Sequence, residues 1–213
     1  KTVKRNKKGY YRFDDFSIKI NENSLYNDIF LSITNNKTEI PKTFTKIHKP
    51  FTLMPNNVPF KNNVVLSYLG NKPGGIFSYN SSLEKWIYIQ EMEDDSLIAN
   101  ITSGGTFAIL NEKNPPKIKN IFPNNKSTYN IEDLELISFN ITDDESGINS
   151  KSIEIKLNNN TQYYEYIKYR DLIRTDIDKN YLNKTNNLEI SIRDNLGNKK
   201  NYNGVFYLKW NLL

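Results

Sequence analysis

Short segments with alternating apolar and polar residues run along the whole chain of 213 residues and predict strands. In KSIEIKL at 151–157, Ile153, Ile155 and Leu157 share one face, and NLEISIR at 187–193 alternates in the same way. No segment keeps a 3.6-residue period, and the best helical candidate is IYIQEMEDDSLIA at 87–99. We therefore predict an all-β fold. Further runs rich in Ile, Val, Phe and Tyr lie at 16–20, 29–33, 64–69, 75–79, 85–89, 105–110, 134–141, 162–169 and 204–210.

A proline-containing segment, NEKNPPKIKNIFPNNKS at 111–127, divides these strands into two blocks. Adjacent prolines at 115 and 116 do not fit inside a strand ladder, so the segment predicts a domain boundary. With short strands near 117–121 and 171–175, the second block has about seven strands in roughly 100 residues, which is typical of an immunoglobulin-like sandwich. We predict two tandem β-sandwich domains behind a basic tail, with bounds at 1–12 (tail), 13–112 and 113–213.

The positive charge is concentrated at the start of the chain. The net charge is +5, and KTVKRNKK at 1–8 holds five of the 29 basic residues, so the rest balances at 29 − 5 = 24 against 24 acidic residues. A nucleic-acid-binding domain carries a basic face within its fold, so we expect no nucleic-acid partner. We interpret the segment as a flexible linker, with a contact to an anionic lipid or polymer as the alternative.

Composition excludes several kinds of chemistry. The absence of cysteine excludes disulfides and thiolate sites, and no apolar run reaches the length of a membrane span. His48 is the only histidine, which argues against a catalytic zinc site, and no Gly-x-Ser-x-Gly elbow accompanies it. KPGG at 72–75 lacks the Lys-Ser/Thr ending of a phosphate loop.

Carboxylate pairs of the kind glycosidases use lie in turn-like stretches, at Asp14 and Asp15, Asp94 and Asp95, and Asp143 and Asp144. We therefore expect no catalytic residues and no enzyme activity from this chain.

Four tyrosines in QYYEYIKY at 162–169 raise a second question. Tyr163, Tyr164, Tyr166 and Tyr169 have the ring surfaces that stack on sugars. We favour the structural interpretation, in which a strand carries aromatic side chains on both faces.

The densest cluster of acidic groups is ITDDESGIN at 141–149. It is predicted to lie between two strands at the end of the sandwich that also holds RDNLGN at 193–198. In one interpretation Asp144 caps the turn and Gly147 adopts a positive φ. In the alternative, the carboxylates converge on a calcium ion, which accepts oxygen ligands. The candidate calcium ligands are Asp143, Asp144, Glu145 and Asp194.

Two sets of motifs resemble known modules. ITDDESGINSKSIEIKLN and YLNKTNNLEISIRDNLGN in the second block are similar to bacterial immunoglobulin-like modules. In the first block, FSIKINENSLYNDIFLSI, FTLMPNNVPFKNNVVLSYL, EKWIYI and SGGTFAIL resemble a ZU5-type β-sandwich. Self-cleavage at a His-Phe-Ser site, known in some ZU5 proteins, is not expected here because the only histidine lies in IHKPF.

In this order the two blocks resemble the non-catalytic region that follows the catalytic domain of envelope M23-type (lysostaphin-like) peptidases. The resemblance implies a region in the bacterial cell envelope, periplasmic or surface-exposed, that positions such a peptidase, with peptidoglycan or an envelope protein as partner. A surface adhesin or scaffold module that binds a protein or glycan is the alternative.

Overall fold

The chain forms an all-β protein that divides into two compact units, Lys1–Lys113 and Asn114–Leu213. The computed structural model describes residues 1–71, 73–90 and 97–209. The division lies inside the predicted proline-containing segment. The described residues include no helix long and apolar enough to cross a membrane.

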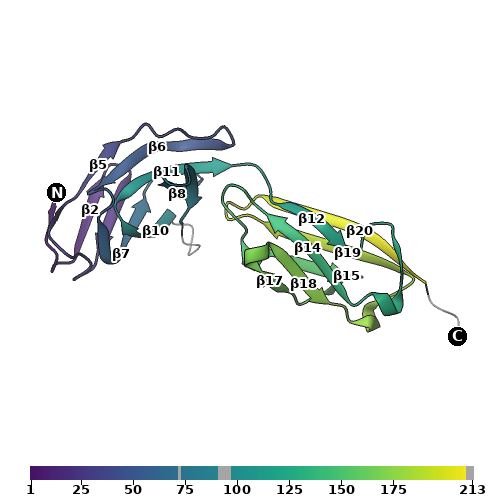
Figure 1. The fold of residues 1–213 in the computed structure, drawn as a ribbon. Helices are drawn as coiled ribbons and strands as arrows, with labels where there is room; N and C mark the ends of the chain where they lie inside the picture. Colours follow the sequence, from purple (N-terminus) through teal and green to yellow (C-terminus); the bar gives the residue numbers. More distant parts are fainter. Residues whose placement is uncertain (72, 91–96, 210–213) are drawn as a thin grey trace. The chain divides into compact units, whose positions relative to one another are not determined.

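The first unit is built from two facing sheets and a short strand pair (Figure 1). One sheet has the order β10-β7-β3-β2, the other has the order β5-β6-β11-β8-β9, and β1 pairs with β4. Their bounds are β1 (Thr2–Val3), β2 (Gly9–Phe13), β3 (Phe16–Ile20), β4 (Ile29–Phe30), β5 (Ser32–Asn35), β6 (Phe44–Met54), β7 (Pro59–Tyr68), β8 (Gly75–Asn80), β9 (Lys85–Tyr88), β10 (Leu97–Ser103) and β11 (Gly105–Glu112).

Apolar side chains from both sheets form one core in this unit. Phe16, Ile18 and Leu66 of the four-stranded sheet and Phe51 and Ile109 of the five-stranded sheet are almost completely buried. Burial of such residues is worth about 1.5–3 kcal/mol each, so the alternation that the sequence shows along β3 is what orients the sheet.

The second unit repeats the two-sheet plan with its own core (Figure 1). Its sheets have the orders β12-β14-β18-β17 and β13-β20-β19-β15-β16, antiparallel except that β13 runs parallel to β20. The strands are β12 (Lys117–Phe122), β13 (Thr128–Asn130), β14 (Leu136–Thr142), β15 (Glu154–Leu157), β16 (Asn160–Thr161), β17 (Glu165–Ile167), β18 (Leu172–Asp176), β19 (Thr185–Arg193) and β20 (Lys199–Lys209). Four three-residue 3₁₀ turns are η1 (Ile131–Asp133), η2 (Ser150–Ser152), η3 (Lys168–Arg170) and η4 (Lys179–Tyr181).

Several predicted elements differ from the structure. The segment 1–12, predicted as a flexible tail, contributes β1 and most of β2, and Val3 is fully buried. It is held because β1 pairs with β4 and the Leu31 N–H donates to the Lys1 carbonyl at 2.8 Å. The helical pattern at 87–99 is wrong where the chain is described, because its ends lie in β9 and β10, and residues 91–96 lie outside the described residues.

The buried position of Val3 gives the first prediction. Val3→Ala removes two buried methyl groups and should cost about 2 kcal/mol of unfolding free energy. The melting temperature of the first unit, followed by circular dichroism, should fall by roughly 10 °C. The neighbouring Thr2→Ala change, at an exposed position, serves as the control. An unchanged melting temperature for Val3→Ala would mean that residues 1–12 behave as a flexible tail.

Candidate functional site

The two loops that sequence reasoning placed at one end of the second unit do lie together. Residues 143–149 connect β14 to η2, and residues 194–198 connect β19 to β20. An antiparallel bridge joins Ile148 to Asp194, and the Asn195 N–H donates to the Gly147 carbonyl at 3.0 Å. Asn195 Nδ2 also donates to the Ser146 carbonyl at 2.8 Å. The acidic stretch is therefore hydrogen-bonded to the second loop.

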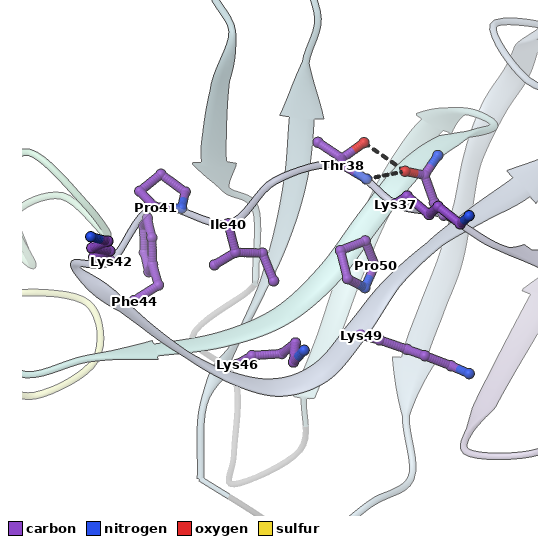
Figure 2. A pocket seen from close by; sticks show the side chains of 10 residues that line it. Lys37, Thr38, Ile40, Pro41, Lys42, Phe44, Lys46, Lys49 and Pro50 are labelled. Atoms are coloured by element: carbon purple, nitrogen blue, oxygen red, sulfur yellow. Dashed lines mark hydrogen bonds between the residues drawn. The ribbon is translucent and has the colours of Figure 1, made fainter.

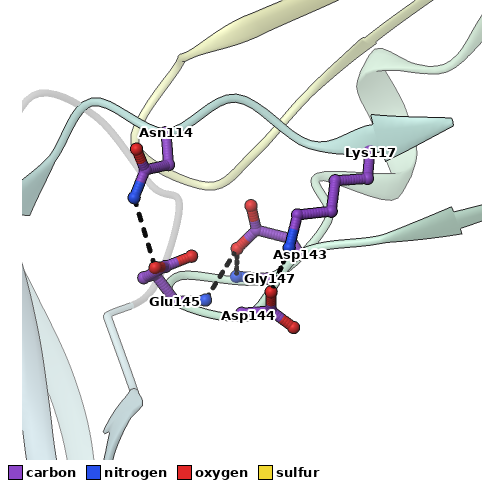
Figure 3. Close-up of polar contacts among 6 residues, drawn as sticks. All are labelled: Asn114, Lys117, Asp143, Asp144, Glu145 and Gly147. Atoms are coloured by element: carbon purple, nitrogen blue, oxygen red, sulfur yellow. Dashed lines mark hydrogen bonds and ion pairs between the residues drawn. The ribbon is translucent and has the colours of Figure 1, made fainter. Parts of the chain in front are cut away.

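Asp143 organises the first loop (Figure 3). Its Oδ1 accepts hydrogen bonds from the Gly147 N–H at 2.7 Å and from the Glu145 N–H at 3.2 Å. Gly147 has a φ of 83°, which confirms the expected positive value. The carboxylate that accepts from the Gly147 N–H is that of Asp143, one position before the Asp144 named in the prediction.

Asp194 has the same role in the second loop. The side chain is fully buried, and its Oδ1 accepts from the N–H groups of Leu196 at 2.9 Å and Asn198 at 2.8 Å. Its Oδ2 accepts from Asn198 Nδ2 at 2.7 Å. Donors to a charged oxygen offset the cost of removing the carboxylate from water.

The four candidate calcium ligands do not converge as a set. Carboxylate oxygens of Asp143 and Asp194 lie within 4.8 Å of each other. Asp144 instead forms an ion pair with Lys117, and Glu145 accepts from Asn114 Nδ2 at 3.3 Å (Figure 3). Burial raises the pKa of Asp143 above its ordinary value of 3.8, against the hydrogen bonds from Gly147 and Glu145, and the negative charge of Asp194 adds to the rise. The geometry is that of two backbone-binding carboxylates side by side.

The other candidates are dispersed. His48 lies on β6 with its ring edge-on to Phe16 and its Nε2 4.0 Å from Asp15 Oδ2. Within the described part of the chain, no serine hydroxyl hydrogen-bonds to that ring. Asp14 and Asp15 form the turn between β2 and β3. Asp94, Asp95 and Lys72 of the KPGG stretch lie outside the described residues.

The four tyrosines of the segment 162–169 differ in their exposure to solvent. Tyr164 and Tyr166 pack against the core of the second unit, whereas Tyr163 is 96% and Tyr169 82% exposed. Arg170 lies over the Tyr169 ring at 5.2 Å. The strand predicted at 162–169 is shorter in the structure, because β17 spans only Glu165–Ile167 and Tyr169 lies in η3. The segment leaves the rings of Tyr163 and Tyr169 open to solvent.

A concave site that sequence reasoning missed lies in the first unit, between the segment 36–43 and β6 (Figure 2). Its volume is about 420 Å³. It is lined by Asn36, Lys37, Thr38, Ile40, Pro41, Lys42, Phe44, Lys46, Lys49 and Pro50, which we call the basic loop pocket. The signal in the sequence was four lysines within 13 residues, spread over a loop and a strand whose proximity only the fold reveals.

Comparison with known proteins gives no family to which the chain can be assigned. No protein-family model matches it, and no curated protein matches it significantly. The resemblances to ZU5-type and immunoglobulin-like modules stay predictions.

The φ of Gly147 gives a prediction for the acidic loop. Gly147→Ala should cost about 1 kcal/mol, because a side chain is disfavoured at positive φ although a Cβ would meet only an ordinary contact, with Asn195 Nδ2 at 3.6 Å. The melting temperature of the second unit should fall by about 4–8 °C. Gly147→Asn is the control at the same position, since asparagine adopts positive φ more readily than alanine and should lower the melting temperature less. Equal effects of the two changes would contradict the turn assignment.

The raised pKa of Asp143 predicts a pH dependence. Folding favours the protonated carboxyl, so stability from this group is fully present below pH 3.8 and is lost as the pH rises through the folded pKa. Asp143→Asn keeps an oxygen acceptor for Gly147 and Glu145 but does not titrate. Its melting temperature relative to wild type should therefore rise between about pH 3.5 and pH 7. A fall over that range would contradict the assignment.

Calcium provides the complementary check of the same loop. If the two carboxylates only bind backbone groups, millimolar calcium leaves the melting temperature of the wild type unchanged at neutral pH. A rise of several degrees that Asp143→Asn or Asp194→Asn abolishes would mean that the ion binds the folded state, and the structural assignment of both loops would be wrong.

Proposed function

We propose that the chain is a non-catalytic β-sandwich region of a bacterial cell-envelope protein, with a positioning or binding role near the wall. The observation that carries the proposal is the presence of two units, each with two facing sheets and its own apolar core, divided at a proline-containing segment. Such units in series are suited to spacing and presenting loops.

The finer assignments belong to the same proposal. The second unit is immunoglobulin-like: its sheets of four and five strands pack over one core within 100 residues. The first unit is the ZU5-like one. Together they serve as an accessory region of an M23-type peptidoglycan metallopeptidase. Asp143 and Asp194 accept hydrogen bonds from backbone N–H groups, which supports a structural role for these candidate metal ligands.

A free-standing adhesin or scaffold module is the second candidate. The basic loop pocket favours this second function, because a recess lined by several charges can bind a ligand without a partner domain. Both candidates share the expectation of binding without turnover.

Binding to the wall tests the proposal. The whole chain should pellet with purified peptidoglycan sacculi and not with cellulose, an insoluble neutral glycan. The sacculi should release no soluble fragments, with or without added zinc. Equal pelleting with cellulose, or none with sacculi, would contradict the wall-binding role. Release of fragments that His48→Ala abolishes would contradict the non-catalytic role.

A further inference from the structure

The basic loop pocket arises from an edge left open in the five-stranded sheet. β5 pairs with β6 only over Phe51–Met54, so the first half of β6 has β11 on one side and no strand of the described residues on the other. The segment 36–43 passes along this free edge and arches over it (Figure 2). Register shifts between β6 and β11 at this half of the strand bend it away from a regular ladder. The recess is thus a product of the backbone path.

Hydrogen bonds fix the segment at its start. The Asn36 N–H donates to the Pro50 carbonyl at 3.0 Å, and Asn36 Nδ2 donates to Thr52 Oγ1 at 2.8 Å. Asn36 Oδ1 accepts from both the backbone N–H and the hydroxyl of Thr38, at 2.7 and 2.6 Å (Figure 2). One side chain therefore ties the segment to β6 and shapes its first turn.

Further contacts hold the rest of the segment. The buried Trp86 donates its Nε1–H to the Glu39 carbonyl at 2.9 Å, and the Phe44 N–H donates to the Pro41 carbonyl at 3.0 Å. The Phe44 ring packs edge-on against Phe77 at 5.2 Å. A recess held in this way is preformed, so a ligand does not have to order the segment when it binds.

The charge of the pocket has one sign. Lys37, Lys42, Lys46 and Lys49 line it, all four exposed, and no carboxylate does. Among the described residues, none of the four has an acidic group within 4.0 Å. A recess on the second unit differs: there Lys156 and Lys199 lie with acidic residues, Glu154 and Glu189. Four ammonium groups around one recess repel each other, and an anionic occupant relieves that repulsion.

The remaining lining residues limit the class of anionic ligand that fits the pocket. Ile40 points from the segment into the recess, and Phe44, Pro41 and Pro50 add apolar surface (Figure 2). Lysines are point charges on flexible stems and lack the planar fork with which arginine grips a single phosphate. Spaced point charges over an apolar floor suit carboxylates repeated along a chain whose rings offer nonpolar faces.

We infer that the basic loop pocket binds a stretch of acidic polysaccharide, with the four lysines on its carboxylates and Ile40 and Phe44 against its sugar rings. This inference rests on the proposed wall-binding function and gives it a site and a ligand class. The pocket, and not the basic segment 1–8, is then the anion-binding surface of the chain.

Binding to polygalacturonate, measured by fluorescence anisotropy with a labelled oligomer in about 0.1 M salt, tests the inference. The variant Lys46→Glu/Lys49→Glu should lose about tenfold or more in affinity. The control Lys7→Glu/Lys8→Glu makes the same charge change at two exposed lysines of the same unit and should change affinity less than about threefold. Lys46→Gln/Lys49→Gln, milder for folding, should also weaken binding, and circular dichroism confirms that each variant is folded.

Three results would overturn the inference. They are equal losses in the pocket and control variants, unchanged binding in both pocket variants, and tighter binding of poly-glutamate than of polygalacturonate, which would point to an acidic peptide. Pelleting with sacculi distinguishes a failure of the pocket inference from a failure of the proposed function. If pocket variants still pellet with sacculi, the wall-binding function is supported and the pocket is not its binding site. If the wild-type chain binds polygalacturonate through the pocket but does not pellet with sacculi, the pocket inference is supported and the wall-binding function is wrong.

Discussion

The burial of facing apolar sides of two sheets is the constraint on which each unit depends. In the first unit the rings of Phe16 and Phe51 meet across the layers with centroids 4.1 Å apart, and in the second Phe139 and Phe206 are buried in an equivalent core. Because side chains alternate along a strand, fixing one face to the core also determines which residues lie on the other face. The loops and edges that present functional groups are therefore placed by the cores.

Loops at the strand ends need acceptors for backbone N–H groups, and polar side chains supply them. Asp143 and Asp194 do this in the second unit, as Asn36 does in the first. A buried N–H without a partner costs about 1–3 kcal/mol, so each of these side chains has a structural task that its residue type does not reveal. Within the acidic stretch Asp143 meets this requirement, and in the first unit Asn36 meets it at the start of the loop that forms the basic loop pocket.

Much of the all-β fold could be predicted where alternation is clean, as in β3 and β19. β6 was not predicted, because Pro50, its lysines and the register shifts against β11 hide its period. β1 was mistaken for part of a tail because charged neighbours surround the single buried residue Val3. Asp143 and Asp144 both precede Gly147 closely, and only the path of the turn decides which carboxylate reaches its N–H. The pocket was missed for a related reason, since its lysines come together only through an unpaired sheet edge.

We propose that binding takes place on the preformed loop of the basic loop pocket and not on the exposed rings of Tyr163 and Tyr169 or on the basic segment 1–8. Backbone NMR shifts of the whole chain, titrated with trigalacturonate, test this most directly. We expect the largest shift changes within residues 36–50, with a saturable dependence on ligand concentration. Changes concentrated at 163–170 or at 1–8, with residues 36–50 unmoved, would contradict it.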